Sequence, residues 1–407
     1  HYPKEWLPQN ADEEKTWLPD LIVQSQTGRF HYMWFETRHK LKDWINAGQQ
    51  HQAWATRIMS EALRRDSNLT SQAIHLFIDA FPSGWMKTIV DCERKLKPAF
   101  FEYKEALAPV LVNIRTDRYK FYSGEDYNLE LWICNDTHNT YQNAVVKWQI
   151  ESDGEPIKAG KTGANISNCN SVFQGFLKLK LPEVAERSAI TVRAGLFDAD
   201  DVLINESSID LEIFPKASVG KISALVIGKF DGPAARLTEE LDIKIDVENP
   251  DCILIDDHQA FKDRSTEILN AVKNGAKAIL LEIPEGSYKI ANSQITVTAC
   301  GMGARHFVSR DTGHKIAKEF KPEDFKFWYD QDLEMVSPFL ETTFTADGWK
   351  PILTSGNGDW RGNWKPELAA AEKRFGKGIL RICQVKLAGR CKTNPVAGIF
   401  ANKLVGE

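Results

Sequence analysis

A carboxylate and two aromatic side chains follow one short apolar run of the sequence. The run 73–78 leads directly into Asp79, and Phe81 and Trp85 flank a Pro-Ser-Gly turn just after it. The face of a tryptophan is apolar enough to stack on the C–H side of a sugar ring, and the aspartate and phenylalanine could contact the same sugar. Asp79, Phe81 and Trp85 are therefore our candidates for substrate binding. The alternative is structural: Asp79 orders the turn through its own side chain, and the two aromatic residues cover the end of the preceding strand.

The other residue types that carry chemistry form no recognisable site. The seven cysteines are scattered singly, without a Cys-x-x-Cys pair, so we expect small buried residues rather than disulfides or a zinc site. The histidines lack the spacing of metal ligands. The segment GKFDG (228–232) opens a helix after a strand but lacks the spacing of a phosphate loop, and we interpret it as a plain turn. We expect no metal and no cofactor.

The elements before residue 109 are predicted to alternate as helix, strand and helix. Residues 38–66 are predicted to be helical, with a break or kink near Gly48. The run 73–78 is predicted to be a buried strand, and 102–107 a further helix. The helical pattern rests on an apolar stripe made of Trp54, Ile58 and Ala62, with Ala55 and Met59 beside it.

This order is typical of a parallel α/β unit. A complete (β/α)8 barrel takes roughly 250 residues, so residues 1–108 are expected to form only the C-terminal part of one.

Residues 109–215 change to a period of two. Tyr127, Leu129, Leu131 and Ile133 share one face of a predicted strand, and the runs 146–150 and 209–213 repeat the alternation between turn signals. About seven short strands in this span are typical of an immunoglobulin-like β-sandwich.

Residues 216–407 return to alternating strands and helices. The strands are predicted at 222–227, 252–255 and 278–283, with helices between them, the second of which is stopped by Gly275, and with a last buried strand in RFGKGILRICQV. This pattern predicts a doubly wound α/β domain. The fold class is therefore multidomain, with α/β parts and one all-β part.

The segments QAWATRIMSEALRRD (52–66) and AIHLFIDAFPSGWMKTIVDCERKLKPAFFEYKEAL (73–107) resemble the last part of the catalytic barrel in glycoside hydrolase family 2. That family includes β-galactosidases, β-mannosidases and β-glucuronidases. Its final barrel strand ends in an aspartate and a Pro-x-x-x-Trp turn, followed by a Val-Asp pair and a Lys-Pro-Ala unit. The matching residues here are Asp79, Pro82, Trp85, Val90-Asp91 and Lys97-Pro98-Ala99. A β-sandwich after the barrel is also the habit of that family.

The resemblance implies a retaining glycosidase, in which one carboxylate is the acid/base and another is the nucleophile. In the family both precede the last barrel strand, so the acid/base is expected upstream of this chain. Two glutamates before the last barrel strand, Glu5 and Glu36, are candidates for the nucleophile, because they lie outside obviously solvated runs. Neither follows an apolar strand, however, so we expect both to be ordinary surface or helix-start carboxylates. We therefore expect no catalytic residue in this chain. It would be the C-terminal portion of an enzyme acting on terminal β-linked sugars of oligo- or polysaccharides, supplying a pocket wall and accessory domains.

The third domain is similar to the glutamine-amidotransferase-like, flavodoxin-like domain that some β-galactosidases carry at the C-terminus. An active amidotransferase would need a strained Gly-x-Cys-x-Gly elbow. The corresponding strand, AILLEIPEG, has Glu282 and Pro284 in that place, and Cys252 and Cys300 lack flanking glycines. We expect this domain to be non-catalytic.

Three tryptophans stand among glycine, asparagine and aspartate in the stretch 347–367, and three interpretations of Trp349, Trp360 and Trp364 stay open. They could form a carbohydrate platform, contact another domain or subunit, or fill the core of their own domain. The second interpretation would make the C-terminal domain the place where a homo-oligomer forms.

The amino-acid composition is typical of a soluble globular protein. The chain of 407 residues is 43% hydrophobic and 26% charged, with a net charge of −5, so we expect neither a nucleic-acid nor a membrane partner. A carbohydrate substrate is what the resemblance implies. The residues from His1 onward contain no basic-then-apolar leader, and any export signal would have been upstream, so these residues do not give the localisation. The resemblance favours the bacterial periplasm or the extracellular space. The competing function is a non-catalytic carbohydrate-binding or oligomerisation module.

Overall fold

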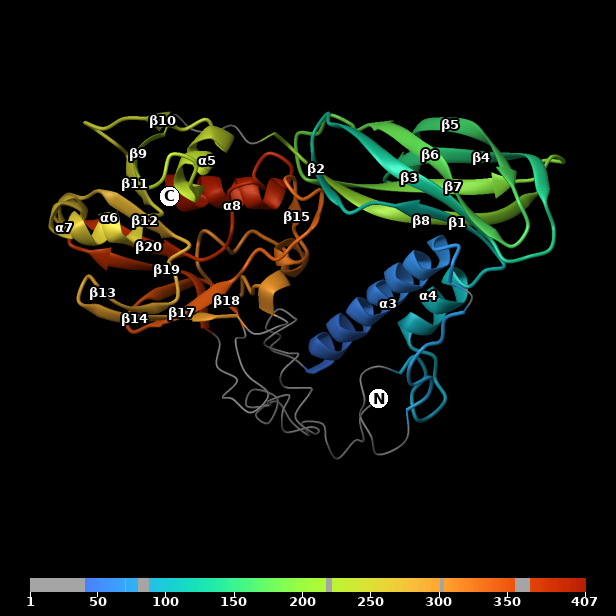
Figure 1. The fold of residues 1–407 in the computed structure, drawn as a ribbon, viewed down its shortest axis with the longest axis horizontal. Coiled ribbons are helices and arrows are strands. Elements are labelled where there is room, and N and C mark those ends of the chain that lie inside the picture. The colour runs from blue at the N-terminus through green and yellow to red at the C-terminus, as the bar shows by residue number, and fades with distance from the viewer. Residues whose placement is uncertain (1–40, 70, 80–87, 217–221, 301–303, 356–366) are drawn as a thin grey trace. The chain divides into compact units, whose positions relative to one another are not determined.

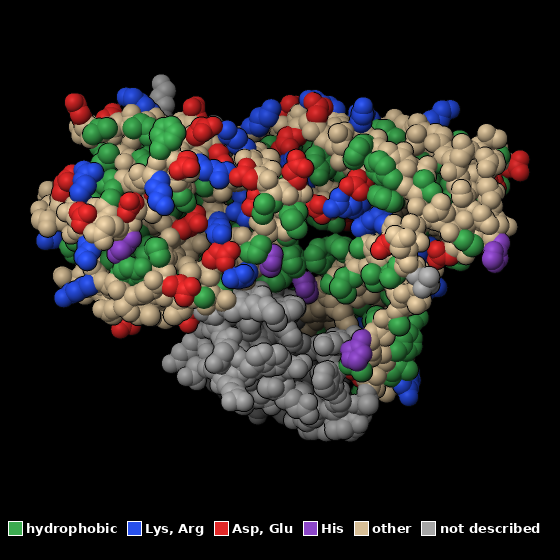
Figure 2. Space-filling view, viewed as in Figure 1, with side chains coloured by type: hydrophobic (Ala, Val, Ile, Leu, Met, Phe, Trp, Pro, Cys, Tyr) green, Lys and Arg blue, Asp and Glu red, His purple; other side chains and the backbone are tan. Residues whose placement is uncertain are grey.

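The computed structural model describes residues 41–69, 71–79, 88–216, 222–300, 304–355 and 367–407, and Figure 1 shows their arrangement. The chain is a mixed α/β protein with substantial β-sheet content. It divides into two compact units: described residues up to Lys216 belong to the first unit, and those from Ile222 belong to the second. None of the helices in these ranges is long and apolar enough to cross a membrane. Charges of both signs are interspersed over the described surface visible in Figure 2.

Two sheets form most of the first unit and share one hydrophobic core. One sheet has the order β1-β3-β6 and the other β2-β8-β7-β4-β5; neighbouring strands are antiparallel except for the parallel pair β2 and β8. The strands are β1 (Val110–Arg115), β2 (Lys120–Tyr122), β3 (Asp126–Asn135), β4 (Tyr141–Ser152), β5 (Glu155–Ile166), β6 (Asn170–Lys180), β7 (Ser188–Phe197) and β8 (Leu203–Phe214).

The alternation in the sequence sets which side chains face this core. Leu129, Leu131 and Ile133 of β3 are buried in it, as the period of two predicts. Val146 and Ile150 of β4 are buried in the same core. Strand β1 is the exception, because its residues are buried on both faces up to Arg115.

Two helices precede the sheets. Helix α3 (Leu41–Arg65) runs without interruption through Gly48, so the expected break is wrong. One glycine costs about 1 kcal/mol in a helix interior, which the long flanking segments tolerate. Helix α4 (Pro98–Ala106) begins earlier than predicted, because Pro98 at its first turn has no N–H to satisfy.

Helix α3 buries the opposite face from the one that the apolar pattern predicts. Met59 and Ala62 of the predicted stripe are exposed, whereas Glu61 and Arg64 are buried. The polar face is bound by hydrogen bonds. Glu61 accepts from Asn113 at 2.6 Å, and Arg64 donates to the Ala106 carbonyl at 2.8 Å. These bonds to β1 and α4 outweigh the apolar pattern in orienting the helix.

The run 73–78 does not form the predicted buried strand. Only an isolated bridge joins Ile78 to Val90, and Phe77 and Ile78 are both exposed. An extended segment becomes a strand only when a neighbour takes its backbone N–H and C=O groups. No longer ladder is formed with it by the described residues.

A ten-stranded sheet organises the second unit, with the order β10-β9-β11-β12-β20-β19-β17-β14-β13 and β18 paired to β19. The strands are β9 (Ser223–Ile227), β10 (Lys244–Ile245), β11 (Cys252–Ile255), β12 (Lys277–Leu281), β13 (Gly286–Ile290), β14 (Ser293–Ala299), β17 (Thr342–Ala346), β18 (Lys350–Ser355), β19 (Glu367–Phe375) and β20 (Gly378–Cys383), and a separate small hairpin joins β15 (Tyr329–Asp330) to β16 (Met335–Val336).

The first five strands of this order are parallel, as predicted for the three at 222–227, 252–255 and 278–283. Beyond β20 the pairing becomes antiparallel, which the sequence pattern did not indicate. The predicted last strand, β20, is central and almost wholly buried.

Helices cover both faces of the parallel part. Helix α6 (His258–Asp263) and helix α7 (Ser265–Asn274) contribute to the core on one face. Helix α7 ends at Gly275, whose φ of 125° suits glycine, as predicted. On the other face, Lys277 of β12 donates to the Val405 carbonyl of helix α8 (Pro395–Gly406). Helix α5 (Pro233–Glu240) follows β9, and two 3₁₀ turns lie at 304–306 and 322–325. Trp349 is buried in the core of this unit.

Candidate functional site

Asp79 is the only predicted site residue within the described part of the chain. Phe81, Trp85, Glu5 and Glu36 lie outside the described residues, and so do Trp360 and Trp364.

The Asp79 carboxylate is held by the lysine of the Lys-Pro-Ala unit. Asp79 Oδ2 lies 2.9 Å from Lys97 Nζ, and the two side chains are 11% and 10% exposed. Lys97 Nζ also donates to Thr88 Oγ1 at 2.6 Å. The backbone fixes both ends of the pair, because Asp79 N donates to Val90 O and Lys97 N donates to Ile89 O, each at 3.0 Å.

One oxygen of this carboxylate stays available. Asp79 Oδ1 is buried and has no hydrogen-bond partner among the described residues. A carboxylate oxygen can accept from a hydroxyl group, and Lys97 holds it in one orientation. The arrangement can therefore accept one hydrogen bond from a ligand hydroxyl, but it contains no second carboxylate for acid–base work.

A second place for chemistry is the carboxyl edge of the parallel strands in the second unit. In doubly wound sheets ligands bind where the strand order reverses. Here the reversal lies between β9 and β11, since β10 pairs on the far side of β9. Asp256 follows β11 directly at this position.

Asp256 occupies the place where a phosphate would bind. Its Oδ2 accepts from Ala234 N, in the first turn of α5, at 2.7 Å, and its Oδ1 accepts from Lys229 N at 3.3 Å. A Cβ on Gly228 would lie 1.8 Å from this carboxylate, and one on Gly232 would lie 2.4 Å from it. The glycines of GKFDG therefore make room for an internal carboxylate that takes the usual anion position at a helix N-terminus.

The next strand end carries a strained glutamate. Glu282 has a φ of 50°, although it follows β12 where the sequence offered no glycine-flanked elbow. The backbone is therefore strained at this strand end without the flanking glycines of an elbow. Hydrogen bonds hold the turn: Glu282 N donates to Cys383 O at 2.9 Å, and Ile283 N donates to Gln384 Oε1 at 2.8 Å.

Burial raises the pKa of Glu282, while the nearby cations Lys386 and Arg390 oppose the rise. No hydrogen bond or ion pair joins this half-buried carboxylate to another described residue. It could hold or release a proton nearer neutrality than an ordinary glutamate.

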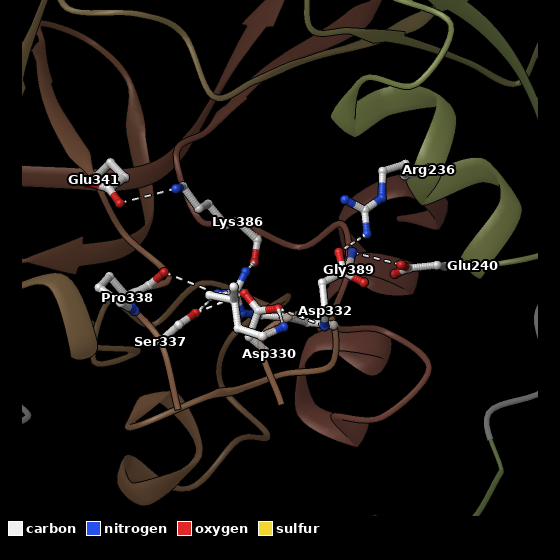
Figure 3. Close-up of polar contacts among 11 residues, drawn as sticks. Arg236, Glu240, Asp330, Asp332, Ser337, Pro338, Glu341, Lys386 and Gly389 are labelled. Atoms are coloured by element: carbon white, nitrogen blue, oxygen red, sulfur yellow. Dashed lines mark hydrogen bonds and ion pairs between the residues drawn. The ribbon is translucent and has the colours of Figure 1, made fainter. Parts of the chain in front are cut away.

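Arg390 lies in the segment after β20, and Figure 3 shows its partners Asp330, Ser337 and Pro338. Its guanidinium is 3% exposed and donates to Ser337 Oγ at 2.6 Å, to Asp330 Oδ2 at 2.9 Å and to Pro338 O at 3.1 Å. Lys386 pairs with Glu341 at 3.2 Å. These three acceptors all bind Nη2, whereas Nε is buried without a hydrogen-bond partner among the described residues. Through Nη2, Arg390 is a structural cation that fixes the loop after β20.

No described nucleophile accompanies Glu282. The nearest strand end carries Cys383, and burial raises its thiol pKa to about 12. Burial also raises the pKa of Cys252 to about 11 and that of Cys300 to about 12. Among the described residues no group of three or more His, Cys, Asp or Glu side chains could hold a metal ion. This edge thus offers an acid without a partner for covalent chemistry.

Neither Asp256 nor Arg390 was predicted to be a site residue from the sequence. A signal for Asp256 was present, because two aspartates directly follow the apolar run CILI. Arg390 carried no comparable signal, because its partners lie more than fifty residues away in sequence.

No protein-family model matches the sequence, and no curated protein matches it. Solved structures that resemble parts of the chain include the exo-chitosanase CsxA of Amycolatopsis orientalis, at 15% identity and a TM-score of 0.34 over 49% of this chain and 24% of that one. The β-D-mannosidase of Dictyoglomus thermophilum is 20% identical, with a TM-score of 0.35 over 56% of this chain and 27% of that one. The chain thus spans about a quarter of the length of these two glycosidases.

Proposed function

We propose that the chain is the C-terminal portion of a retaining glycoside hydrolase that acts on terminal β-linked sugars. In this proposal residues 1–108 form the C-terminal part of a catalytic barrel, Asp79 contacts a sugar hydroxyl, and the catalytic carboxylates lie outside the chain. The sandwich, of immunoglobulin-like type, and the second unit, of glutamine-amidotransferase-like type, are accessory domains.

The Asp79–Lys97 ion pair carries the proposal. The two residues belong to separate pieces of the family motif, the strand-ending aspartate and the Lys-Pro-Ala unit. Their contact at 2.9 Å gives both pieces a joint role. The buried, unpartnered Oδ1 of Asp79 leaves a hydrogen-bond acceptor for a substrate.

A second observation agrees with a barrel that is completed by further polypeptide. Met59 and Leu63 on the outer face of α3 are exposed, and so are Phe77 and Ile78 in the extended run before Asp79. In a complete barrel, apolar side chains at the positions of this helix and this extended segment would pack against neighbouring strands and helices.

The test compares the 407-residue chain with the product of the full reading frame on nitrophenyl β-glycosides of galactose, mannose, glucosamine and glucuronate. We expect turnover from the full product only. Asp79→Asn in the full product should lower kcat/KM about 10- to 150-fold, the value of a hydrogen bond to a charged group.

Asp66→Asn, at the exposed turn that follows α3, is the matched control and should have no effect. Turnover by the 407-residue chain alone, or no turnover by the full product, would refute the proposal. The second of these outcomes would favour the alternative, a non-catalytic carbohydrate-binding or oligomerisation module.

A further inference from the structure

We propose that the outer face of the sheet β1-β3-β6 binds a neutral oligosaccharide through three aromatic side chains. Trp132, Phe173 and Phe176 form this surface, which we call the aromatic strip. It belongs to the sandwich and goes beyond the glycosidase proposal, because it requires no barrel and no turnover.

Strand register places the three rings together. Trp132 of β3 is paired with Phe173 of β6, and the next outward pair toward the N-terminus of β3 is Glu130 with Phe176. A bulge between these pairs, at Gly175 with a φ of 98°, brings the two phenylalanines onto one face although they are three residues apart. The ring centroids of Trp132 and Phe173 are 5.3 Å apart, and those of Phe173 and Phe176 are 5.1 Å apart.

The strip lies beside helix α3 on the outer face of the sheet, where Asn113, the residue paired with Trp132, binds Glu61 of that helix. The two phenylalanine rings of the strip are exposed. Phe173 is 41% exposed and Phe176 is 54% exposed. Their neighbour Leu177 points the other way and is buried in the core. The aromatic side chains are therefore not needed to fill the sandwich.

Polar groups flank the rings in fixed positions. Glu130 accepts from the Trp132 indole N–H at 2.8 Å and also binds Arg115, which pairs further with Asp117 at 2.5 Å. The side chains of Arg115 and Glu130 are partly exposed, so each can still reach a ligand. Each oxygen of Glu130 can accept a second hydrogen bond. One cation, Arg115, faces two carboxylates, Asp117 and Glu130, so this flank carries at most a single negative charge and does not favour an acidic ligand.

The size of the strip argues for a small ligand. A whole aromatic side chain buries about 150–250 Å², so two half-exposed rings and part of a third offer about 250 Å². A stable protein interface takes about 800 Å² on each partner. Ring faces with both donors and acceptors beside them match a sugar, which presents C–H faces and hydroxyl groups. An uncharged oligosaccharide is therefore the occupant that fits the area, the polarity and the charge balance.

Calorimetric titration of the 407-residue chain tests this with cellohexaose, mannohexaose, chitohexaose and the acidic hexagalacturonate. We expect at least one neutral hexaose to bind with a Kd of about 1 mM or tighter. Phe173→Ala combined with Phe176→Ala should weaken that binding about tenfold or more. Phe230→Ala, at a ring in the second unit that is 101% exposed, is the control and should bind as the parent chain does.

Circular dichroism checks that the double variant is folded, which we expect because both rings are exposed. The proposal fails if no neutral hexaose binds at about 1 mM, if the double variant binds as tightly as the parent, or if hexagalacturonate binds best. It also fails if sedimentation shows the parent chain self-associating and the double variant monomeric, because a second copy would then be the occupant. The assay needs no turnover, so its result is distinct from that of the glycosidase test.

Discussion

Asp79 and Lys97 lie eighteen positions apart in the sequence and form an ion pair, with 2.9 Å between Asp79 Oδ2 and Lys97 Nζ. Both side chains are largely buried. Lys97→Met leaves the Asp79 carboxylate buried without its cation. Breaking such a pair from one side costs about 3–5 kcal/mol, and urea unfolding of the first unit would measure the loss.

Lys95→Met is the matched control, since Lys95 forms an exposed pair with Glu93, and it should leave unfolding unchanged. Adding Asp79→Asn to Lys97→Met should recover part of the lost stability, because the stranded charge is then gone. Equal stability of the two lysine variants would show that the pair in the motif has no structural role.

The Asp256 carboxylate serves as an internal anion for helix α5. Asp256→Ala removes the acceptor of Ala234 N and Lys229 N and should destabilise the second unit by about 1–2 kcal/mol. The emptied position is a helix N-terminus with two glycines, so added phosphate should restore part of the thermal stability.

Asp257→Ala is the control for this prediction. Asp257 caps α6 by accepting from Ala260 N at 3.0 Å, and its loss should cost a similar amount without rescue by phosphate. A rescue of both variants to the same extent would mean that phosphate acts non-specifically.

The period of two predicted which residues of β3 face the core, because alternate residues of that strand point into the core shared by the two sheets. Leu129, Leu131 and Ile133 lie in the core as expected. The same reasoning failed for α3, since hydrogen bonds of Glu61 and Arg64 with residues outside the helix decide which face is buried. Apolar periodicity shows which face of a helix could be buried against an apolar surface. It does not show whether polar groups elsewhere in the chain will bind another face more strongly.

For the second unit, the parallel strands followed from their apolar runs, but the antiparallel half of the sheet did not. The site residues depend on contacts between strand ends that are distant in sequence. The strained φ of Glu282 is fixed by hydrogen bonds to the segment after β20, which no local pattern predicts. Asp256 was readable as a strand-end carboxylate, whereas its role as an internal anion required the geometry of Gly228 and Gly232.

Backbone strain at Glu282 gives a prediction of opposite sign. A non-glycine residue in the left-handed region costs about 1 kcal/mol, so Glu282→Gly should raise the melting temperature by about 2–4 °C. Asp153→Gly is the control, because Asp153 has the same φ of 50° in the β4–β5 turn and aspartate tolerates that region; little change is expected. A lower melting temperature for Glu282→Gly would show that the side chain stabilises the turn.

Exposed and buried cysteines should differ in their rate of reaction with a thiol reagent. Cys169 is exposed, whereas Cys252 and Cys300 are buried. With a pKa of about 11, fewer than about one Cys252 in a thousand is thiolate at pH 7.5. Iodoacetamide should therefore label Cys169 quickly and leave Cys252 and Cys300 unmodified, as peptide mass mapping can check. Fast modification of Cys252 or Cys300 would contradict the expectation that the second unit is non-catalytic.

A buried network around Glu372 should make the second unit sensitive to acid. Glu372 Oε2 lies 3.0 Å from Arg381 Nη2, and Glu372 Oε1 lies 3.0 Å from His314 Nε2; Arg381 and His314 are both fully buried. Burial by itself raises the pKa of Glu372, but the hydrogen bonds from His314 and Arg381 outweigh it, so its pKa lies below the ordinary value.

The unfolded chain therefore binds more protons than the folded one between the lowered pKa and the ordinary value near 4.5. The stabilisation by Glu372 is complete above that value and is lost as the pH falls through the lowered pKa.

Glu372→Gln should cost about 3–5 kcal/mol at pH 7, because it leaves Arg381 buried without a counter-charge, and the cost should shrink in more acidic solution. Glu267→Gln, in an exposed pair with Arg264, should change little at any pH. Urea unfolding of the three proteins from pH 7 down to pH 3 measures this, and a cost for Glu372→Gln that does not change with pH would contradict the ionic role of the network.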